Sequence, residues 1–258
     1  MLLDLEQVTL RFAGNTVLDK VDFGVEAGSL ASLIGPNGAG KTSLFNSITG
    51  FYRPQEGRIE FNGERILRRK PHKVTQFGIA RTFQNVRLFR EMSVMENVMA
   101  GMHCRTRAGA FGAVFRTPGQ RAEERYIAEV AHDCMKFVGV DEYADRLATN
   151  LAYGYQRLVE IARALATQPQ LILLDEPAAG LNGTEKAALV ELIRRIRDER
   201  NVAVLLIEHD MGLVMQVSEH IHVLDYGRII AKGTAEQVKN DPKVIEAYLG
   251  QEDEEMAL

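Results

Sequence analysis

Short apolar and alternating segments in the first part of the chain predict β-strands. Residues 2–34 alternate between apolar and polar positions in short segments broken at residues 14–15 and 27–28, which is typical of antiparallel strands. Residues 30–34 (LASLI) are continuously apolar and fit a buried strand. Residues 57–62 (GRIEFN) predict a further strand that ends in an Asn-Gly turn. These segments predict an N-terminal antiparallel β region next to one buried strand.

The middle of the chain changes to the three- to four-residue period of helices. Ser93 and Glu96 form a capping box that opens a first helix. A second helix ends at Gly139, and a third begins near Tyr155. The stretch from about residue 88 to residue 165 is therefore expected to be mostly helical.

The last third of the chain alternates between strands and helices. Residues 171–174 and 202–207 are all-apolar strands, and the segment between them has the period of a helix. This βαβ unit predicts a parallel sheet with right-handed crossovers, so we expect an α/β fold. The tail, residues 251–258, contains four consecutive acids and is expected to be solvated and disordered.

Residues 35–42 read GPNGAGKT and match the phosphate-binding P-loop, G-x-x-x-x-G-K-[ST]. Glycines let the backbone approach phosphates and adopt positive φ, and successive N–H groups at a helix N-terminus bind anions. Lys41 is expected to reach the β- and γ-phosphates, and the Thr42 hydroxyl to ligate Mg²⁺. The motif therefore predicts a nucleoside triphosphate with Mg²⁺.

The alternative for this motif is a glycine-rich turn that binds nothing. The sequence around it favours the phosphate site, because the apolar run 30–34 precedes it and a short helical pattern, residues 41–49, follows it. Strand, glycine-rich turn and helix, in this order, are the context that a P-loop requires.

Two carboxylates follow the apolar run in LILLDEP, residues 171–177. They emerge at the carboxyl end of a predicted parallel strand, where ligands bind in open α/β sheets. Asp175 is expected to hold Mg²⁺ with Thr42, and Glu176 to orient or deprotonate a water molecule. The alternative is an acidic turn. Gln84 in RTFQN and His209 after the last apolar strand are unremarkable when each is taken alone.

Composition and charge bear on the class of protein and on its expected location in the cell. The 258 residues are 46% hydrophobic with a formal net charge of -4, so nothing in the overall charge indicates nucleic acid. Cys104 and Cys134 lack metal-ligand spacing, and we interpret both as packing residues in a reducing compartment. There is no apolar run of about 18 residues and no signal-peptide pattern. A soluble cytoplasmic protein is expected, with any membrane role supplied by a partner.

One basic segment lies outside these motifs. Between Glu96 and Glu123 there is no acid, whereas arginines interleave with apolar residues at Arg105, Arg107, Phe111, Val114, Phe115, Arg116 and Arg121. This segment predicts contact with acidic headgroups or with a transmembrane subunit. A solvated basic loop with a short helix explains the same pattern.

Five segments together resemble the nucleotide-binding subunit of an ABC transporter, and within that family the larger ATPase of branched-chain amino-acid importers. They are GPNGAGKT, RTFQNVRLF, NLAYGYQR, LILLDEPAAGLN and LLIEHDM, in the order that the family has them. The resemblance extends over essentially the whole chain. It implies a P-loop ATPase core of residues 1–87 and 166–258, RecA-like with an antiparallel β region, and an inserted helical signature subdomain of residues 88–165.

The resemblance also implies a role for each site residue. Gln84 would sense Mg²⁺ and couple the site to the membrane partner, Glu176 would be the catalytic base, and His209 would contact the γ-phosphate and the attacking water. Residues 179–182 would be the D-loop. The residues expected to bind the nucleotide, with the first stacking on adenine, are Phe12, Val17, Gly35, Pro36, Asn37, Gly38, Ala39, Gly40, Lys41, Thr42 and Ser43.

The signature motif departs from the family's general form, LSGGQ. Here it consists of Leu151, Ala152, Tyr153, Gly154, Tyr155 and Gln156, and it is expected to face the ATP of a partner subunit. Ala152 has no hydroxyl to donate to the γ-phosphate, and Tyr155 replaces the usual glutamine. Gly154 and the following helix remain, and a helix N-terminus still faces a phosphate favourably.

By resemblance, the chain uses ATP and Mg²⁺, hydrolyses ATP and powers an importer, most closely one for branched-chain amino acids. Its partners would be transmembrane permease subunits and a second, related ATPase. A heterodimer is expected, with a homodimer left open, at the cytoplasmic face of the inner or plasma membrane. Amide or urea import and a soluble ATP-dependent dimerising regulator remain as alternatives. A non-hydrolysing scaffold conflicts with the presence of Lys41, Glu176 and His209.

Overall fold

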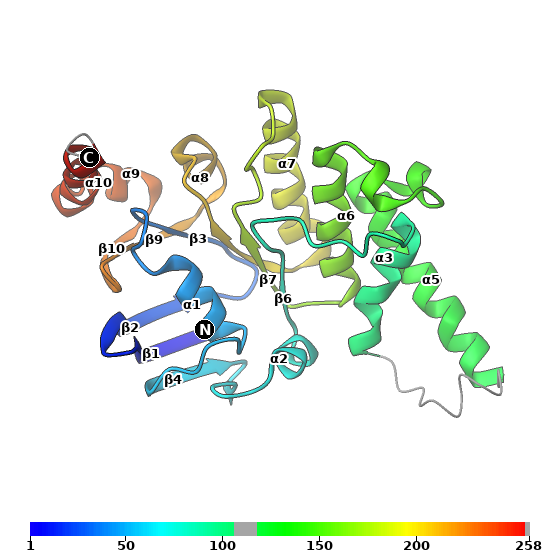
Figure 1. Cartoon of the computed structure of the whole chain (residues 1–258), viewed down its shortest axis with the longest axis horizontal. Helices are drawn as coiled ribbons and strands as arrows, with labels where there is room; N and C mark the ends of the chain where they lie inside the picture. Colours follow the sequence, from blue (N-terminus) through cyan, green and yellow to red (C-terminus); the bar gives the residue numbers. More distant parts are fainter. Residues whose placement is uncertain (106–117, 256–258) are drawn as a thin grey trace.

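The computed structural model describes residues 1–105 and 118–255 of the chain, and Figure 1 shows the order and arrangement of its elements. The strands are β1 Leu3–Phe12, β2 Asn15–Val25, β3 Leu30–Ile34, β4 Glu56–Phe61, β5 Glu64–Arg65, β6 Ile79–Arg81, β7 Leu171–Asp175, β8 Ala203–Ile207, β9 His220–Asp225 and β10 Arg228–Gly233. The helices are α1 Lys41–Ile48, α2 Pro71–Phe77, α3 Val94–Gly101, α5 Pro118–Val138, α6 Tyr153–Ala166, α7 Gly183–Arg200, α8 Met211–Val217, α9 Ala235–Lys239 and α10 Pro242–Glu255.

The larger sheet has the strand order β10-β9-β3-β8-β7-β6. Strand β3 pairs in parallel with β8 and β9, β7 pairs in parallel with β6 and β8, and β10 is antiparallel to β9. Every residue of β3, β7 and β8 is buried, which explains why these strands read as continuous apolar runs. The predicted βαβ unit is confirmed, because α7 connects the parallel strands β7 and β8.

The smaller sheet is antiparallel, with the order β2-β1-β4-β5, as the alternating N-terminal segments predicted. One apolar cluster contains side chains from this sheet, from α1 and from the larger sheet, including Leu5, Phe45 and Leu205. Helix α1 therefore packs between the two sheets, which fixes the P-loop before it against both of them (Figure 1).

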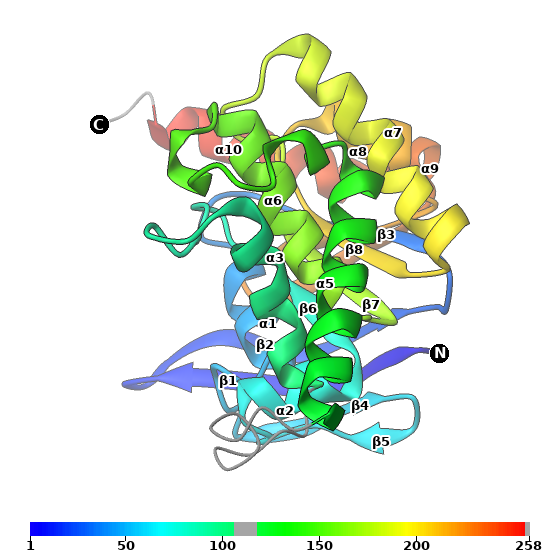
Figure 2. The same cartoon turned by 90° about the vertical axis from the view of Figure 1, so that its right-hand side faces the viewer.

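Helices α3, α5 and α6 pack beside one another (Figure 2), on the side of the molecule away from the smaller sheet (Figure 1). The predicted capping box is confirmed, with Ser93 and Glu96 each accepting the other's backbone N–H. Gly139 follows α5 with a φ of 81°, so the predicted stop is confirmed as well. The apolar faces of these helices share one cluster with Leu174 of β7 and Leu206 of β8, which makes their packing continuous with the sheet.

The structure bears on two predictions about the surface, the acidic tail and the basic segment. The disordered acidic tail is wrong for residues 251–255, because α10 continues to Glu255, and glutamate is a good helix former. In the basic segment, Arg107, Phe111, Val114, Phe115 and Arg116 lie outside the described residues. Arg105 donates to the backbone carbonyls of Thr167, Gln76 and Gln168, so this arginine joins elements of the fold.

The predicted packing role of the cysteines agrees with burial at Cys134, whereas Cys104 is half-buried. Burial raises the pKa of both thiols, which keeps them in the unreactive protonated form. Among the helices that the structure describes, none is both long and apolar enough to cross a lipid bilayer.

Candidate functional site: a nucleotide site at the strand ends

The P-loop connects β3 to α1 in a conformation that needs glycine. Gly35 has a φ of 147°, and a Cβ atom there would lie 1.9 Å from the carbonyl oxygen of Leu224. Gly40 is the N-cap of α1 with a φ of 107° and supplies no side-chain cap. This arrangement leaves the first turn of α1 to be satisfied by an anion, as phosphate sites at helix N-termini are.

Lys41 bends back over this loop. Its Nζ donates to the carbonyl oxygens of Gly35, at 2.7 Å, and Pro36, at 2.8 Å. Burial lowers the pKa of Lys41, while the carboxylates of Glu176 and Asp175 act in the opposite direction. The P-loop cation is therefore within electrostatic reach of both acids that follow β7.

The remaining loop positions present a mixed surface to the strand ends. Asn37, Gly38 and Thr42 are exposed, Ser43 is half-buried, and Ala39 packs into the core. The Thr42 hydroxyl thus lies on an accessible first turn, where a ligand can reach it.

Three predicted catalytic residues converge at the end of β7. Gln84 Nε2 donates to Glu176 Oε2 at 2.8 Å across 92 residues of sequence. His209 Nδ1 lies 3.9 Å from the same oxygen. The side chain of His209 is 66% exposed and that of Glu176 is 21% exposed, so the cluster opens to solvent. Glu176 has a φ of 48°, a conformation uncommon for a non-glycine residue, and such strain concentrates at functional sites.

Asp175, the predicted Mg²⁺ ligand, has a protein partner that the sequence did not indicate. Its Oδ2 forms a buried ion pair with Arg81 at 2.7 Å, and the Arg81 guanidinium also donates to Asn46 Oδ1. That guanidinium lies over the rings of Phe45 and Phe83, at 5.5 and 5.1 Å from their centroids. The pair locks the end of β7 to β6 and α1.

The side chains available for Mg²⁺ are of the right chemical kind. Thr42, Gln84 and Asp175 offer hydroxyl, amide and carboxylate oxygens, the hard donors that Mg²⁺ prefers. The described part of the chain has no group of three or more His, Cys, Asp or Glu side chains that could hold an ion by themselves. This fits Mg²⁺, which is bound by one or two carboxylates together with waters and substrate phosphates.

The predicted adenine contact lies at the end of the β1–β2 hairpin. Phe12 is 44% exposed and packs edge-on against Tyr52, with ring centroids 5.0 Å apart. Val17 is half-buried, and its carbonyl oxygen lies 3.0 Å from the position that a Cβ of Gly40 would take. The hairpin therefore adjoins the P-loop and offers one accessible ring. Tyr52, which positions that ring, was not predicted.

The signature residues lie at the start of α6. Leu151 is buried, whereas Tyr153 and Tyr155 are exposed, and Gln156 Nε2 donates to the carbonyl oxygen of Leu151 at 2.8 Å. Ala152 is the N-cap and provides no side-chain cap. The N–H groups at this helix start therefore lack the hydroxyl partner that a serine would supply.

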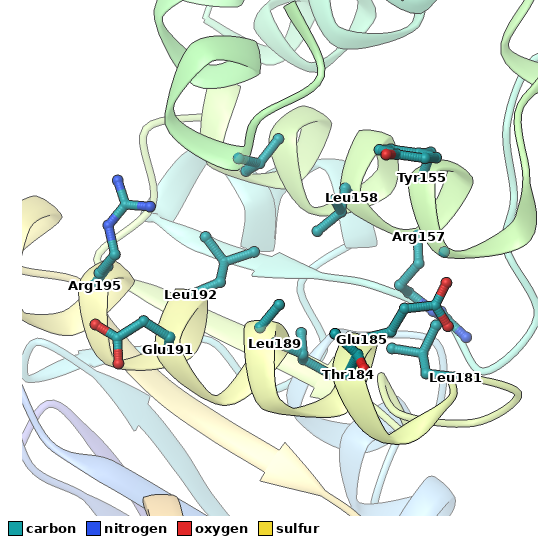
Figure 3. Close-up of a pocket in the computed structure, with 13 residues that line it drawn as sticks. Tyr155, Arg157, Leu158, Leu181, Thr184, Glu185, Leu189, Glu191, Leu192 and Arg195 are labelled. Carbon is teal, nitrogen blue, oxygen red and sulfur yellow. The ribbon is translucent and has the colours of Figure 1, made fainter.

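A cavity of about 440 Å³ extends from the signature along the groove between α6 and α7. Figure 3 shows Tyr155 and Leu158 of α6 facing Leu189 and Leu192 of α7 across it. At its end near the signature, Gly154 approaches Glu185 so closely that an added Cβ would lie 2.8 Å from the carboxylate. The signature helix is thus packed directly on the segment that follows the predicted D-loop.

Three buried charged residues with clear structural roles were missed from the sequence. Glu208 accepts the backbone N–H of Ala178 and of His209, and burial raises its pKa. Arg157 and Glu160 form an ion pair inside the protein. The available signals were weak, because an acid ending an apolar strand and an i,i+3 charge pair on a helix are both usually solvated.

With the geometry established, comparison with known proteins assigns the class. The sequence model of the ABC transporter family matches residues 18–179. The fold is similar to the crystal structure of the ADP conformation of MJ1267, an ATP-binding cassette of an ABC transporter, with a TM-score of 0.84, 34% identity, and coverage of 96% of this chain and 98% of that one. The chain belongs to the ATP-binding subunits of ABC transporters, and it is an ATPase coupled to solute transport.

Within that family, the similarity is high to one group of subunits. Over 250 residues the chain is 47% identical to the high-affinity branched-chain amino acid transport ATP-binding protein BraF of Pseudomonas aeruginosa, covering 97% of this chain and 98% of that protein. It is 44% identical to the corresponding protein LivG of Escherichia coli K12, with the same coverage. A model of branched-chain amino acid ATP-binding cassette transporters also matches residues 228–254.

Proposed function

We propose that this chain is the ATP-hydrolysing subunit of an importer for branched-chain amino acids. The observation that carries the hydrolytic part is the convergence of Gln84, Glu176 and His209 beside the P-loop. The solute class rests on near-full-length similarity to BraF and LivG and on the C-terminal match. Amide and urea import, the alternatives left open by the sequence, are disfavoured by the same similarity.

Each site residue has a defined task in this proposal. Lys41 and the N–H groups of the P-loop hold the phosphates, and Phe12 stacks on the adenine ring. Thr42, Gln84 and Asp175 would hold Mg²⁺, which would neutralise negative charge on the phosphates. Glu176 accepts a proton from the attacking water. His209, beside Glu176 and open to solvent, contacts the γ-phosphate.

The composite site would be completed by a second ATPase. The exposed start of the signature helix of one chain would face the nucleotide on the other, so two P-loops and two signatures would form two sites. We propose that this chain pairs with a related but different ATPase, because its P-loop and acids are intact while Ala152 and Tyr155 weaken its signature. In such a heterodimer, only the partner's nucleotide faces the weakened signature.

We further propose that the permease subunits dock beside the segment that carries Gln84. A cavity of about 540 Å³ opens there between the core (residues 1–87 and 166–258) and the helical part (residues 88–165), and Phe83, Arg87 and Arg163 contribute to its lining. A partner seated in it would contact the backbone next to Gln84. The subunit would then work at the cytoplasmic face of the membrane as a peripheral protein.

Replacing the P-loop lysine tests the nucleotide site. Lys41→Ala is expected to abolish ATP binding, because the cation and the backbone cradle act together on the phosphates. Equilibrium binding of a fluorescent ATP analogue measures this, with Lys20→Ala, a lysine of β2 outside the P-loop, as the matched control. Unchanged affinity in Lys41→Ala would show that residues 35–42 are not the phosphate site.

A further inference from the structure

An ion pair lies fully buried in the signature helix α6. Arg157 and Glu160 are 0% and 1% exposed, and Arg157 Nη1 lies 3.0 Å from Glu160 Oε2. Apolar side chains of similar size often replace such pairs without loss of stability, so burial of two charges is not explained by stability alone. The contacts of the two side chains indicate what the pair does.

Both members bind the backbone of the segment that carries Gln84. The Arg157 guanidinium donates to the carbonyl oxygens of Phe83 and Gln84, each at 2.6 Å. Glu160 Oε1 accepts the backbone N–H of Phe83 at 3.4 Å and that of Arg87 at 3.3 Å. A planar guanidinium with several fixed donors can reach a carboxylate and two carbonyls together, which an ammonium group cannot match.

The same guanidinium also reaches the signature itself. Arg157 Nη2 donates to the hydroxyl of Tyr153, the first residue of α6, at 3.1 Å. Figure 3 shows Arg157 pointing from α6 away from Tyr155, toward the side where Leu181 and Glu185 lie. Because the Gln84 side chain donates to Glu176, the contacts run without interruption from the signature helix to the catalytic carboxylate.

We infer that Arg157 and Glu160 are positioning residues that make the signature helix and residues 83–87 move as one unit. Nucleotide binding at this chain's own P-loop, sensed through Gln84, is thereby transmitted to the signature that faces the other nucleotide. The inference rests on the proposed function. It adds a route by which one ATP site of the dimer influences the second.

The test uses the full chain and variants that do not leave one member of this pair charged without the other. We call the contacts of Arg157 and Glu160 with the backbone of residues 83–87 the tether. The double variant Arg157→Met/Glu160→Met removes the tether and keeps side chains of similar volume at both positions. Arg157→Lys keeps a cation opposite Glu160 but lacks the donors to hold both carbonyls, so it supplies a second variant if the double one fails to fold. The matched control is Arg195→Met/Glu199→Met, which replaces an exposed ion pair on α7. Arg195, like Arg157, lines the cavity between α6 and α7.

Hydrogen–deuterium exchange with and without Mg²⁺ and a non-hydrolysable ATP analogue, AMP-PNP, reads the coupling directly. In the wild type and the control, AMP-PNP is expected to change exchange at residues 83–87 and at residues 152–156 together. In the double variant and in Arg157→Lys, the response at 83–87 remains and the response at 152–156 is lost. A purely structural role would raise exchange with and without nucleotide, and would leave the nucleotide-dependent difference in place.

Two results overturn the inference. One is a nucleotide response at 152–156 in both tether variants as large as in the wild type. The other is a wild type that binds AMP-PNP and shows no response at 152–156. Affinity for AMP-PNP, measured on the same samples, separates the two proposals: a wild type that binds no nucleotide contradicts the proposed function, whereas normal binding with unaltered coupling contradicts only the role of Arg157 and Glu160.

Discussion

At the scale of the residue, Glu176 combines the features expected of a general base. It follows a fully buried strand, has a positive φ, and shares one carboxylate oxygen between Gln84 and His209. Burial lowers the pKa of the P-loop lysine, Lys41, and the Glu176 carboxylate acts in the opposite direction, so the two charges lie within electrostatic reach of each other. The neighbours of Glu176 hold the carboxylate in place, and its partial exposure leaves room for a water molecule.

Glu176→Gln removes the base and keeps the shape of the site. ATP binding is expected to persist, because the P-loop is untouched, while turnover falls by about 10²-fold or more, the scale of a lost general base. Phosphate release in single-turnover experiments measures the chemical step. Turnover at the wild-type rate would assign the base elsewhere, and Glu191→Gln, an exposed acid of α7, controls for the loss of one negative charge.

Residue roles divide into those that sequence reveals and those that packing creates. The P-loop residues follow from the chemistry of phosphate binding, and Asp175 and Glu176 follow from their place after a buried strand. The roles of Gln84 and His209 came from the resemblance. Their approach to Glu176 was not predicted, since sequence alone does not bring together residues 92 and 33 positions apart. Arg81 and Arg157 were missed, because their burial depends on partners from distant elements.

At the scale of the element, the start of α6 is where the signature departs from the family's general form. Its N-cap, Ala152, supplies no side-chain acceptor. Ala152→Ser is expected to raise the free energy of unfolding by about 0.5–2 kcal/mol, the value of an N-cap hydroxyl. In the assembled ATPase, Ala152→Ser is also expected to raise turnover at the partner's nucleotide. A hydrogen bond from the serine hydroxyl to the γ-phosphate would lower the activation free energy by up to about 0.5–1.5 kcal/mol.

Ala152→Gly separates these two effects. Glycine is a far better N-cap than alanine but has no hydroxyl, so it is expected to stabilise the helix without raising turnover. Urea unfolding and steady-state hydrolysis of the assembled ATPase measure the two quantities. Equal gains in turnover from serine and glycine would mean that helix stability, and not a hydroxyl on phosphate, limits the signature.

Strand β9 contains a half-buried histidine, His222, that is expected to make stability depend on pH. Burial lowers the pKa of His222 to about 4, with Lys232 and His220 acting in the same direction, and its Nδ1 has no hydrogen-bond partner. Since the folded protein holds this ring neutral and the unfolded chain protonates it below about pH 6.5, its contribution is fully present above pH 6.5. That contribution is lost as pH falls toward 4, by up to about 3 kcal/mol.

His222→Phe removes this titration and keeps a ring against Phe23. The wild type is expected to lose stability relative to this variant as pH falls from 7.5 to 5, in urea titrations at each pH. His220→Gln, an exposed histidine of the same strand, is expected to follow the wild type. Parallel pH profiles for wild type and His222→Phe would show that His222 titrates normally in the folded protein.

Most elements were predictable because their signals are local. The apolar runs of β3, β7 and β8 and the capping box of α3 needed no tertiary information. The extent of α10 was not predictable in the same way. Its four acids suggested solvation, and residues 251–255 contain no apolar position whose spacing would predict that the helix continues to Glu255.

At the scale of the whole molecule, the proposed dimer makes the site incomplete within one chain. In that dimer, the P-loop of one chain binds one nucleotide and the signature of the same chain faces the other nucleotide. The tether through Arg157 connects the segment that carries Gln84 to the signature helix. The purified subunit alone is therefore expected to be a weak ATPase that dimerises poorly, and its partner to raise turnover. Turnover and mass by light scattering, with and without the partner, test this, and full activity from a stable homodimer would contradict the heterodimer.

The most direct test of the central claim is solute uptake by the assembled transporter. The chain is reconstituted in proteoliposomes with the proposed permease subunits and partner ATPase, and supplied with ATP on the side of the ATPases. Accumulation of labelled leucine, isoleucine or valine is expected with the wild type and is expected to be lost with Glu176→Gln. Accumulation of urea or a short amide in their place, or leucine uptake that is unaffected by Glu176→Gln, would contradict the account.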